Sequence, residues 1–184
     1  KFEVFEPYKI PRPNIYDVVP DSQNNCYFLV LGSEDVGRID AKTGAIKIFK
    51  TPTPRSGPRR GMMDPQDRVW FGENNGDRIG MFDTKTERFQ EWAVPAPGAW
   101  PYDATADKAG DVWSGNEYND RIQRLDPKSG QSIEYLLPKS TNVRRVFVDN
   151  RTTPATFWVG SNHGASIVKV EPLDAQASAA TVFE

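Results

Sequence analysis

The sequence repeats itself at a nearly constant spacing, and this repeat limits the folds open to the chain more than any other feature. Residues 77–86 read DRIGMFDTKT, and 43 positions later residues 120–129 read DRIQRLDPKS. An acidic, an aromatic and an apolar position recur together at spacings of 43, 43 and 45: Asp40, Asp83, Asp126 and Glu171; Tyr27, Trp70, Trp113 and Trp158; Val36, Ile79, Ile122 and Ile167. Three registers in step indicate four tandem units.

Each unit contains four strand-like runs separated by turn residues. In the third unit these runs are PYDATAD, DVWSGNE, RIQRLDP and SIEYLLP, and Gly, Asn, Asp or Pro lies between them. No window shows the apolar spacing of a capped helix, which excludes a helical solenoid. Four short antiparallel strands in a repeat of about 40–45 residues are typical of a β-propeller blade. We therefore predict an all-β fold, a β-propeller of four-stranded antiparallel blades, with the second-strand tryptophans packed between blades.

The repeat also predicts where each blade begins and ends within a single domain, 1–184. The four blades should span about 14–54, 57–97, 99–139 and 142–184. Residues 2–7, FEVFEP, resemble the fourth strand of a unit and are predicted to belong to a preceding blade. Because four blades close only in the smallest propellers, we expect this chain to form part of a six- or seven-bladed propeller. The remaining blades would come from the same chain or from a partner.

Composition excludes several classes of partner and site. The net charge of −2, with both signs interspersed, argues against nucleic acid or an anionic membrane as the main partner. No apolar run approaches the roughly 20 residues of a membrane helix, so we expect no membrane insertion. Cys26 is the only cysteine, which excludes disulfides and cysteine-based zinc sites within this chain.

The sequence pattern of the repeats is similar to that of a known family. VWFGENNGDRIGMFDTKTERFQEWAVP at 69–95 and the third unit at 101–138 resemble the blades of the virginiamycin B lyase (streptogramin lyase) family. That resemblance implies a seven-bladed propeller and a small or peptidic ligand. The family's lyases linearise cyclic depsipeptide antibiotics by a magnesium-dependent elimination, so it also implies Mg²⁺ as a cofactor. Many members belong to exported bacterial proteins, which implies a periplasmic or secreted location; KFEVFEPYKI lacks a signal-peptide pattern, which leaves a cytoplasmic location as the alternative.

One face of such a propeller should carry most of the polar loops. The loops between second and third strands share this face with the starts of the first strands, around one end of the central channel. Aligning the units on Asp21, Asp64, Asp107 and Asp149 gives equivalent pairs at the first strands: Tyr16–Asp17, Arg59–Arg60, Tyr102–Asp103 and Arg144–Arg145. We expect a ring of alternating charges made by Asp17, Arg60, Asp103 and Arg145, which pair across blades.

Two interpretations of these side chains remain open. The charged ring either only holds the blades together or leaves donors for an anionic ligand. In the second case the ligand-binding residues are Arg59, Arg60, Trp100, Tyr102, Arg144 and Arg145, with Trp100 and Tyr102 as an aromatic wall.

The candidate catalytic residues follow from the family resemblance. His163 is the only histidine, and histidine is the side chain that titrates nearest neutral pH. The resemblance implies that His163 removes a proton in an elimination, with Glu117 as a carboxylate that orients the metal and Glu73 as a second metal ligand. Against this, no acidic residue flanks His163 in SNHGAS, so an ordinary loop histidine is the alternative.

The sequence therefore leaves two functions open. The first is a streptogramin-lyase-like propeller that binds a small or peptidic ligand on its loop-rich face and acts as a magnesium-dependent carbon–oxygen lyase. The alternative is a non-catalytic propeller that serves as an interaction scaffold within a larger exported protein. Fold similarity does not decide between them, because propellers host both kinds of function.

Overall fold

The computed structural model of the chain describes residues 1–9 and 13–173. These residues form four antiparallel sheets, one for each sequence repeat, and no helix. The first sheet contains β1 (Ile15–Pro20), β2 (Cys26–Val30), β3 (Asp35–Ile39) and β4 (Ile46–Lys50). The second contains β5 (Pro58–Met63), β6 (Arg68–Glu73), β7 (Arg78–Asp83) and β8 (Arg88–Ala93).

The other two sheets repeat this plan. The third contains β9 (Pro101–Ala106), β10 (Val112–Asn116), β11 (Arg121–Asp126) and β12 (Gln131–Leu136). The fourth contains β13 (Val143–Asp149), β14 (Thr156–Ser161) and β15 (Ser166–Val170). Within each sheet the strands pair in chain order. The fourth strand predicted for the last unit, ATVFE at 180–184, lies outside the described residues.

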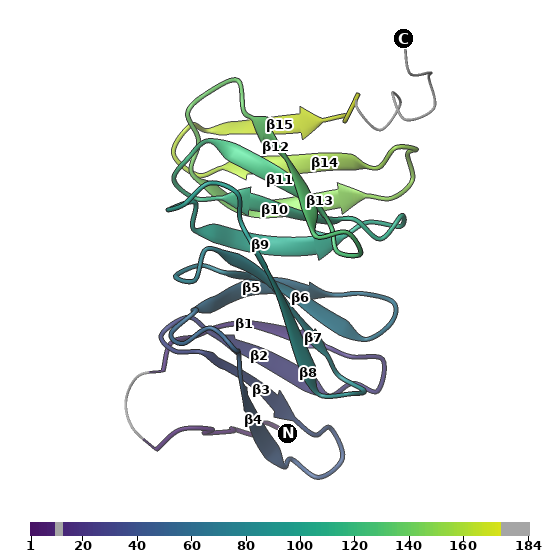
Figure 1. Cartoon of the computed structure of the whole chain (residues 1–184). Coiled ribbons are helices and arrows are strands. Elements are labelled where there is room, and N and C mark those ends of the chain that lie inside the picture. Colours follow the sequence, from purple (N-terminus) through teal and green to yellow (C-terminus); the bar gives the residue numbers. More distant parts are fainter. Residues whose placement is uncertain (10–12, 174–184) are drawn as a thin grey trace.

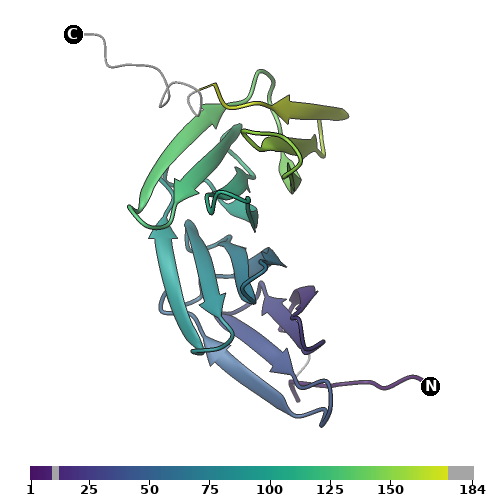
Figure 2. The same cartoon turned by 90° about the vertical axis from the view of Figure 1, so that its right-hand side faces the viewer.

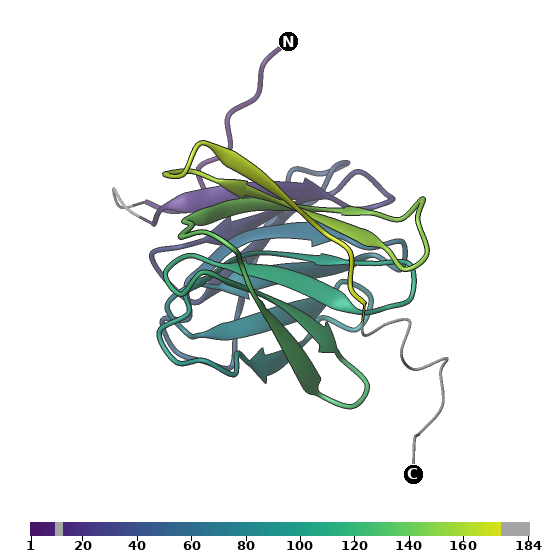
Figure 3. The same cartoon turned by 90° about the horizontal axis from the view of Figure 1, so that it is seen from above.

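The sheets follow one another as the blades of a propeller do (Figure 1). Figure 2 shows them fanned into an arc, with the first strands β1, β5, β9 and β13 on the inner side and β4, β8 and β12 on the outer side. Seen from above, the sheets lie over one another (Figure 3). Neighbouring first strands contact one another along the arc. The predicted all-β propeller architecture is therefore confirmed.

The aromatic residues of the second strands pack between adjacent sheets, as predicted, in the first three units. Tyr27, Trp70 and Trp113 are at most 2% exposed. The ring of Trp113 stacks on Phe157 of the fourth sheet at 4.9 Å between centroids. Trp158, in the last described sheet, is 37% exposed. Burial of such rings is worth several kcal/mol per residue, so these contacts hold neighbouring blades together.

An aspartate at the turn between first and second strands supports each buried tryptophan. Asp64 Oδ1 accepts hydrogen bonds from the backbone N–H of Gln66 and of Arg68, and its Oδ2 accepts one from Trp70 Nε1 at 2.8 Å. Asp107 bonds to Trp113 Nε1 in the same way at 2.9 Å. The repeated aspartate therefore closes a turn and satisfies a buried donor at once.

Residues 2–7 form no strand in this structure, and Phe2 and Val4 are exposed. Their assignment to a preceding blade therefore stays a prediction. Within the described ranges, no helix is present that could cross a membrane.

Candidate functional site

One end of the sheets gathers two sets of loops, as the sequence predicted. Because β1 runs antiparallel to β2, Ile15 at the start of β1 lies opposite Val30 at the end of β2. Pro58 lies opposite Glu73 in the second sheet, and Val143 lies opposite Ser161 in the fourth. The starts of the first strands thus lie beside the loops that join second to third strands. We call this end the loop-rich face.

Each first strand carries a break in its pairing register where it begins on this face. The breaks fall between Ile15 and Asp17, between Pro58 and Gly61, opposite Gly115 and Asn116 in the third sheet, and between Val143 and Arg145. Such bulges turn side chains out of the regular alternation of a strand. The side chains at or beside the breaks are Tyr16, Arg59, Arg60, Tyr102 and Arg144.

These side chains converge although they come from different sheets. The hydroxyls of Tyr16 and Tyr102, two sheets apart, lie 2.5 Å from each other. The guanidinium carbon of Arg59 lies 3.9 Å from the centre of the Tyr102 ring and 5.0 Å from that of Tyr16. Arg60 lies 5.6 Å and 5.8 Å from the same two rings. Two arginines therefore make cation–π contacts with a hydrogen-bonded pair of tyrosines.

This environment shifts the two phenols in opposite directions. Burial raises the pKa of Tyr16, but the hydrogen bonds with Tyr102 and Arg59 and the positive charges of Arg59 and Arg60 together leave that pKa below its ordinary value. Burial and the hydrogen bond with Tyr16 raise the pKa of Tyr102. Tyr16 is thus the first of the two phenols to ionise, and either hydroxyl can donate the hydrogen bond between them while both are neutral.

Glu117 occupies the centre of the same cluster and is 3% exposed. Its carboxylate forms an ion pair with Arg59 and lies 3.7 Å from Nη2 of Arg144. The side-chain amide of Asn74 donates to Glu117 Oε2 at 3.4 Å. The carboxylate that the family resemblance assigned to a metal is therefore held by two guanidinium groups and an amide.

The predicted pairing of charges across blades is confirmed for one neighbouring pair. Asp103 is fully buried, and one of its oxygens lies 3.4 Å from Arg145 Nη1. Burial raises the pKa of Asp103 to about 6, and the positive charge of Arg145 opposes that rise. Asp17 instead accepts a hydrogen bond from the backbone N–H of Gly61 in the next sheet, at 3.1 Å.

Glu73 lies elsewhere, against Glu91 of its own sheet. A Cβ on Gly80, the residue paired with Glu91, would lie 2.8 Å from Glu73 Oε1, so both carboxyl groups face the same side of the sheet. Glu73 is fully buried, and neither of its oxygens receives a hydrogen bond from a donor group within the described part of the chain. Burial, followed by the negative charge of Glu91, raises its pKa to about 9. Glu73 and Glu117, predicted to act together on a metal, therefore have separate surroundings.

His163 and Trp100 both lie at the loop-rich face, in different loops. His163, between β14 and β15, is exposed, and no contact joins it to Glu117 among the described residues. Trp100, just before β9, is 41% exposed and meets Tyr118 edge to face at 5.1 Å between ring centres. The described residues contain no group of three or more His, Cys, Asp or Glu that could hold a metal ion.

Several residues of this face were not predicted as site residues: Tyr16, Asn74 and Asn142 in the cluster, and Tyr118 beside Trp100. The equivalence of Tyr16 with Tyr102 in the repeat was the signal that could have identified Tyr16. Asn74 stands at the position of Glu117, one unit earlier, and its loop position alone gave no role.

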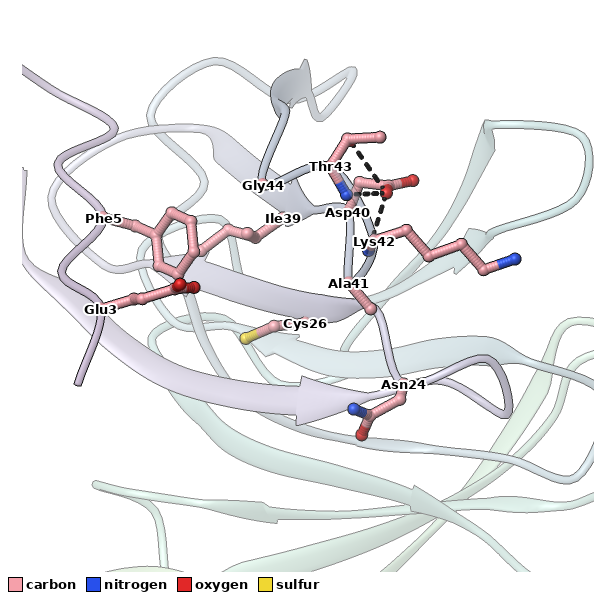
Figure 4. A pocket seen from close by; sticks show the side chains of 10 residues that line it. All are labelled: Glu3, Phe5, Asn24, Cys26, Ile39, Asp40, Ala41, Lys42, Thr43 and Gly44. Atoms are coloured by element: carbon pink, nitrogen blue, oxygen red, sulfur yellow. Dashed lines mark hydrogen bonds between the residues drawn. The ribbon is translucent and has the colours of Figure 1, made fainter. Parts of the chain in front are cut away.

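A separate cavity of about 420 Å³ lies at the opposite end of the first sheet (Figure 4). It is formed by the turns around Asn24 and Asp40 together with Glu3 and Phe5 of the N-terminal segment. The half-buried Cys26 lines it, and burial raises the pKa of its thiol. None of the residues predicted for the site lies there.

Comparisons with known proteins agree on one family. Residues 43–180 match the sequence family described as "Virginiamycin B lyase family". A search of curated protein sequences found no match. A solved streptogramin B lyase is 25% identical with a TM-score of 0.81 over 90% of this chain and 54% of its own.

Two further structures share the fold. Virginiamycin B lyase from Staphylococcus aureus is 23% identical, with a TM-score of 0.74 over 90% of this chain and 58% of its own. A catalytically inactive form of that enzyme with quinupristin is 22% identical, with a TM-score of 0.70 over 91% and 58% of the two chains. The chain thus spans little more than half the length of these structures. Its repeats, its propeller sheets and the match over residues 43–180 show that it belongs to the virginiamycin B lyase family.

Proposed function

We propose that the loop-rich face binds a small or peptidic ligand in a streptogramin-lyase-like propeller. The observation that carries this proposal is the convergence of bulged side chains from the first strands on one cluster around Glu117. Four bulges in equivalent places are not needed to build a sheet, and bulges are frequent beside binding sites. The side chains that they turn inward are the ones best suited to hold a polar ligand.

The cluster offers hydrogen-bond donors that the protein leaves unused. Within the described part of the chain, the Nε atoms of Arg59 and Arg60 are buried and have no acceptor. A buried donor without a partner is unfavourable by about 1–3 kcal/mol, so the folding of this cluster leaves two guanidinium groups incompletely satisfied. Guanidinium groups suit carboxylate and carbonyl oxygens, so a peptide matches this site.

The finer proposal is that this face opens a cyclic ester by elimination. A base removes the proton next to the carbonyl, the carbon–oxygen bond of the ester breaks, and an alkene and a free carboxylic acid form in one linear product. We assign the base to His163, which is exposed on this face, in the sheet that follows Glu117. Nothing is lost in such a ring opening, so substrate and product have the same mass.

Magnesium does not fit the residues described here. Glu117 is already neutralised by Arg59 and Arg144, and Glu73 is a buried carboxyl group whose raised pKa keeps it protonated at neutral pH. Mg²⁺ in proteins is usually held by one or two ionised carboxylates, with water in the other positions of a near-octahedral geometry. We therefore derive no step through the metal from this part of the chain.

The test uses quinupristin, because a related structure contains it. Binding is measured by calorimetry, and ring opening by reversed-phase chromatography with and without magnesium, since mass alone cannot separate substrate from product. We expect Arg59→Gln to weaken binding about tenfold or more, and His163→Ala to abolish ring opening but keep binding. The control is Arg151→Gln, at an exposed turn on the opposite end. Absence of binding by the unaltered protein would favour the scaffold alternative.

A further inference from the structure

Two large aromatic side chains lie exposed together at the rim of the loop-rich face. Trp100 is 41% exposed and Tyr118 is 63% exposed, and their rings meet at 84° with centres 5.1 Å apart. Exposed tryptophan and tyrosine in contact are unusual on a surface that does not bind anything, because both bring a large apolar area into water.

The backbone of Trp100 is held in an unfavourable conformation. Its φ of 55° lies in the left-handed region, which a bulky side chain rarely adopts. Asp77 Oδ1 accepts from the Trp100 N–H at 2.9 Å, and the Trp100 carbonyl accepts from the Glu117 N–H at 3.1 Å. Such strain is of order 1–3 kcal/mol and persists where neighbouring groups impose it, as at binding sites. Here those bonds fix the indole at the rim.

The cationic side chain of Arg144 is connected to this aromatic pair through Glu117. The Glu117 carbonyl accepts a hydrogen bond from Asn142 Nδ2 at 3.2 Å, and Asn142 Oδ1 accepts one from Arg144 Nε at 2.7 Å. The Arg144 side chain is 40% exposed and lies 3.7 Å from the Glu117 carboxylate. Arg144 therefore has its Nε fixed by Asn142 and its Nη2 near Glu117, while its side chain remains 40% exposed.

The balance of charge around the cluster is positive. Among the described residues, the carboxylates that balance the guanidinium groups of Arg59, Arg60, Arg144 and Arg145 are those of Asp17, Asp103 and Glu117. Four positive and three negative charges leave one positive charge in excess, and Arg144 is the more exposed of the two arginines that share Glu117. A cationic rim beside an aromatic platform is complementary to a ligand that carries a carboxylate close to an aromatic ring.

We propose that Trp100, Tyr118 and Arg144 form a subsite for an aromatic residue of a peptide that also carries a carboxylate. The ligand ring packs against Trp100 and Tyr118, and its carboxylate binds the outer N–H groups of Arg144. The carboxylate comes either from a peptide C-terminus or from a neighbouring acidic side chain. This inference rests on the proposed ligand-binding function, and it adds a preference for an anionic peptide.

Three small probes test the subsite and the source of the carboxylate. N-acetyl-phenylalanine carries a terminal carboxylate, N-acetyl-phenylalanine amide carries none, and N-acetyl-aspartyl-phenylalanine amide carries an acidic side chain. Binding is followed by the fluorescence change of the protein and by calorimetry. We expect the first or third probe to bind at least tenfold more tightly than the amide, and the stronger of the two identifies the source. Equal binding of all three would overturn the proposal.

Variants separate the subsite from the rest of the face. Trp100→Ala, Tyr118→Ala and Arg144→Gln should each weaken the carboxylate probes about tenfold, and Tyr118 is exposed enough for its removal to leave the fold intact. The control is Trp158→Ala, which removes a comparably exposed tryptophan from the fourth sheet. If quinupristin binds but the affinity for the carboxylate probes is the same in these variants as in the unaltered protein, the subsite is refuted and the proposed function is not. Absence of binding by quinupristin and by every probe would refute the proposed function with it.

Discussion

Glu73 gives the sharpest prediction, because it is a fully buried carboxyl group to which no group in residues 1–9 and 13–173 donates a hydrogen bond. Its neighbour Glu91 accepts hydrogen bonds from the N–H and hydroxyl of Thr53, at 3.0 and 2.7 Å, and is therefore supported as the ionised partner. A bond between the two carboxyl groups requires a proton on one of them, and burial places that proton on Glu73. Glu73→Gln keeps the shape and the donor while removing the titration.

The expected size follows from linkage. The pKa of Glu73 is about 9 in the folded protein and 4.5 when it is unperturbed, so between these values the folded state holds one more proton than the unfolded state. Stability from this group is therefore complete below pH 4.5 and is lost as the pH rises toward 9. At about 1.4 kcal/mol for each pH unit, the loss is on the order of 3 kcal/mol by pH 7 and 6 kcal/mol by pH 9. Any water that reaches Glu73 reduces this slope.

The assay is urea denaturation of both proteins at intervals between pH 5 and pH 8.5. We expect the free energies of unfolding to be similar near pH 5, and Glu73→Gln to become the more stable protein by about 1 kcal/mol for each pH unit above that. The control is Glu134→Gln, at the position of Glu91 one repeat later, where Asn116 stands in place of Glu73. This control therefore removes a glutamate without breaking a pair of carboxyl groups. A pH-independent difference for Glu73→Gln would refute the shared-proton argument.

Three further perturbations test the packing of the blades and of the site. Asp64→Ala leaves the buried Trp70 Nε1 without its acceptor and should lower the free energy of unfolding by about 2–4 kcal/mol in urea. Gly80→Ala places a Cβ 2.8 Å from Glu73 Oε1 and closer still to the Phe71 ring, and calorimetry should show that the free energy of unfolding falls by about 2 kcal/mol or more. Gly98 lies in open space, so Gly98→Ala should lower the free energy of unfolding by about 1 kcal/mol through its positive φ alone. Arg145→Gln removes the cation that holds down the pKa of Asp103. The stability that Asp103 contributes is lost between pH 3.8 and about 6 in the parent, and in the variant this loss should continue above pH 6. Denaturation at pH 5 and pH 7.5 would detect the difference.

The fold could be predicted from the sequence because the repeat specifies whole strands and the turns between them. The run RIQRLDP predicted a strand that the structure has at Arg121–Asp126, and Trp113 is buried between sheets as its position required. A spacing of 43 residues repeats the same pattern of turns and apolar faces, so an error in one unit is corrected by the others. The pairing of Asp103 with Arg145 followed from the same alignment.

The site was less readable because bulges and alternation decide where each side chain points. In β6, Trp70 faces the following sheet, so Phe71 and Glu73 face the preceding one. Glu73 is the last residue of β6 and adjoins a loop of the loop-rich face, yet this alternation directs its side chain into the space between sheets. Tyr16 and Tyr102 meet across two sheets, a contact that depends on the arc of the blades and on two bulges, neither of which a strand pattern specifies.

The surroundings of Glu117 finally indicate which kind of ligand this face prefers. A cation that took Glu117 as a ligand would have to displace Arg59 and Arg144, and breaking a buried ion pair is unfavourable by about 3–5 kcal/mol. An anion meets no such barrier, because it can approach the exposed side of Arg144 while Glu117 keeps Arg59. Binding an anion at this cluster therefore has a smaller free-energy cost than binding a cation. The arginine pair that holds Glu117 away from a metal is also what makes the loop-rich face suitable for a carboxylate.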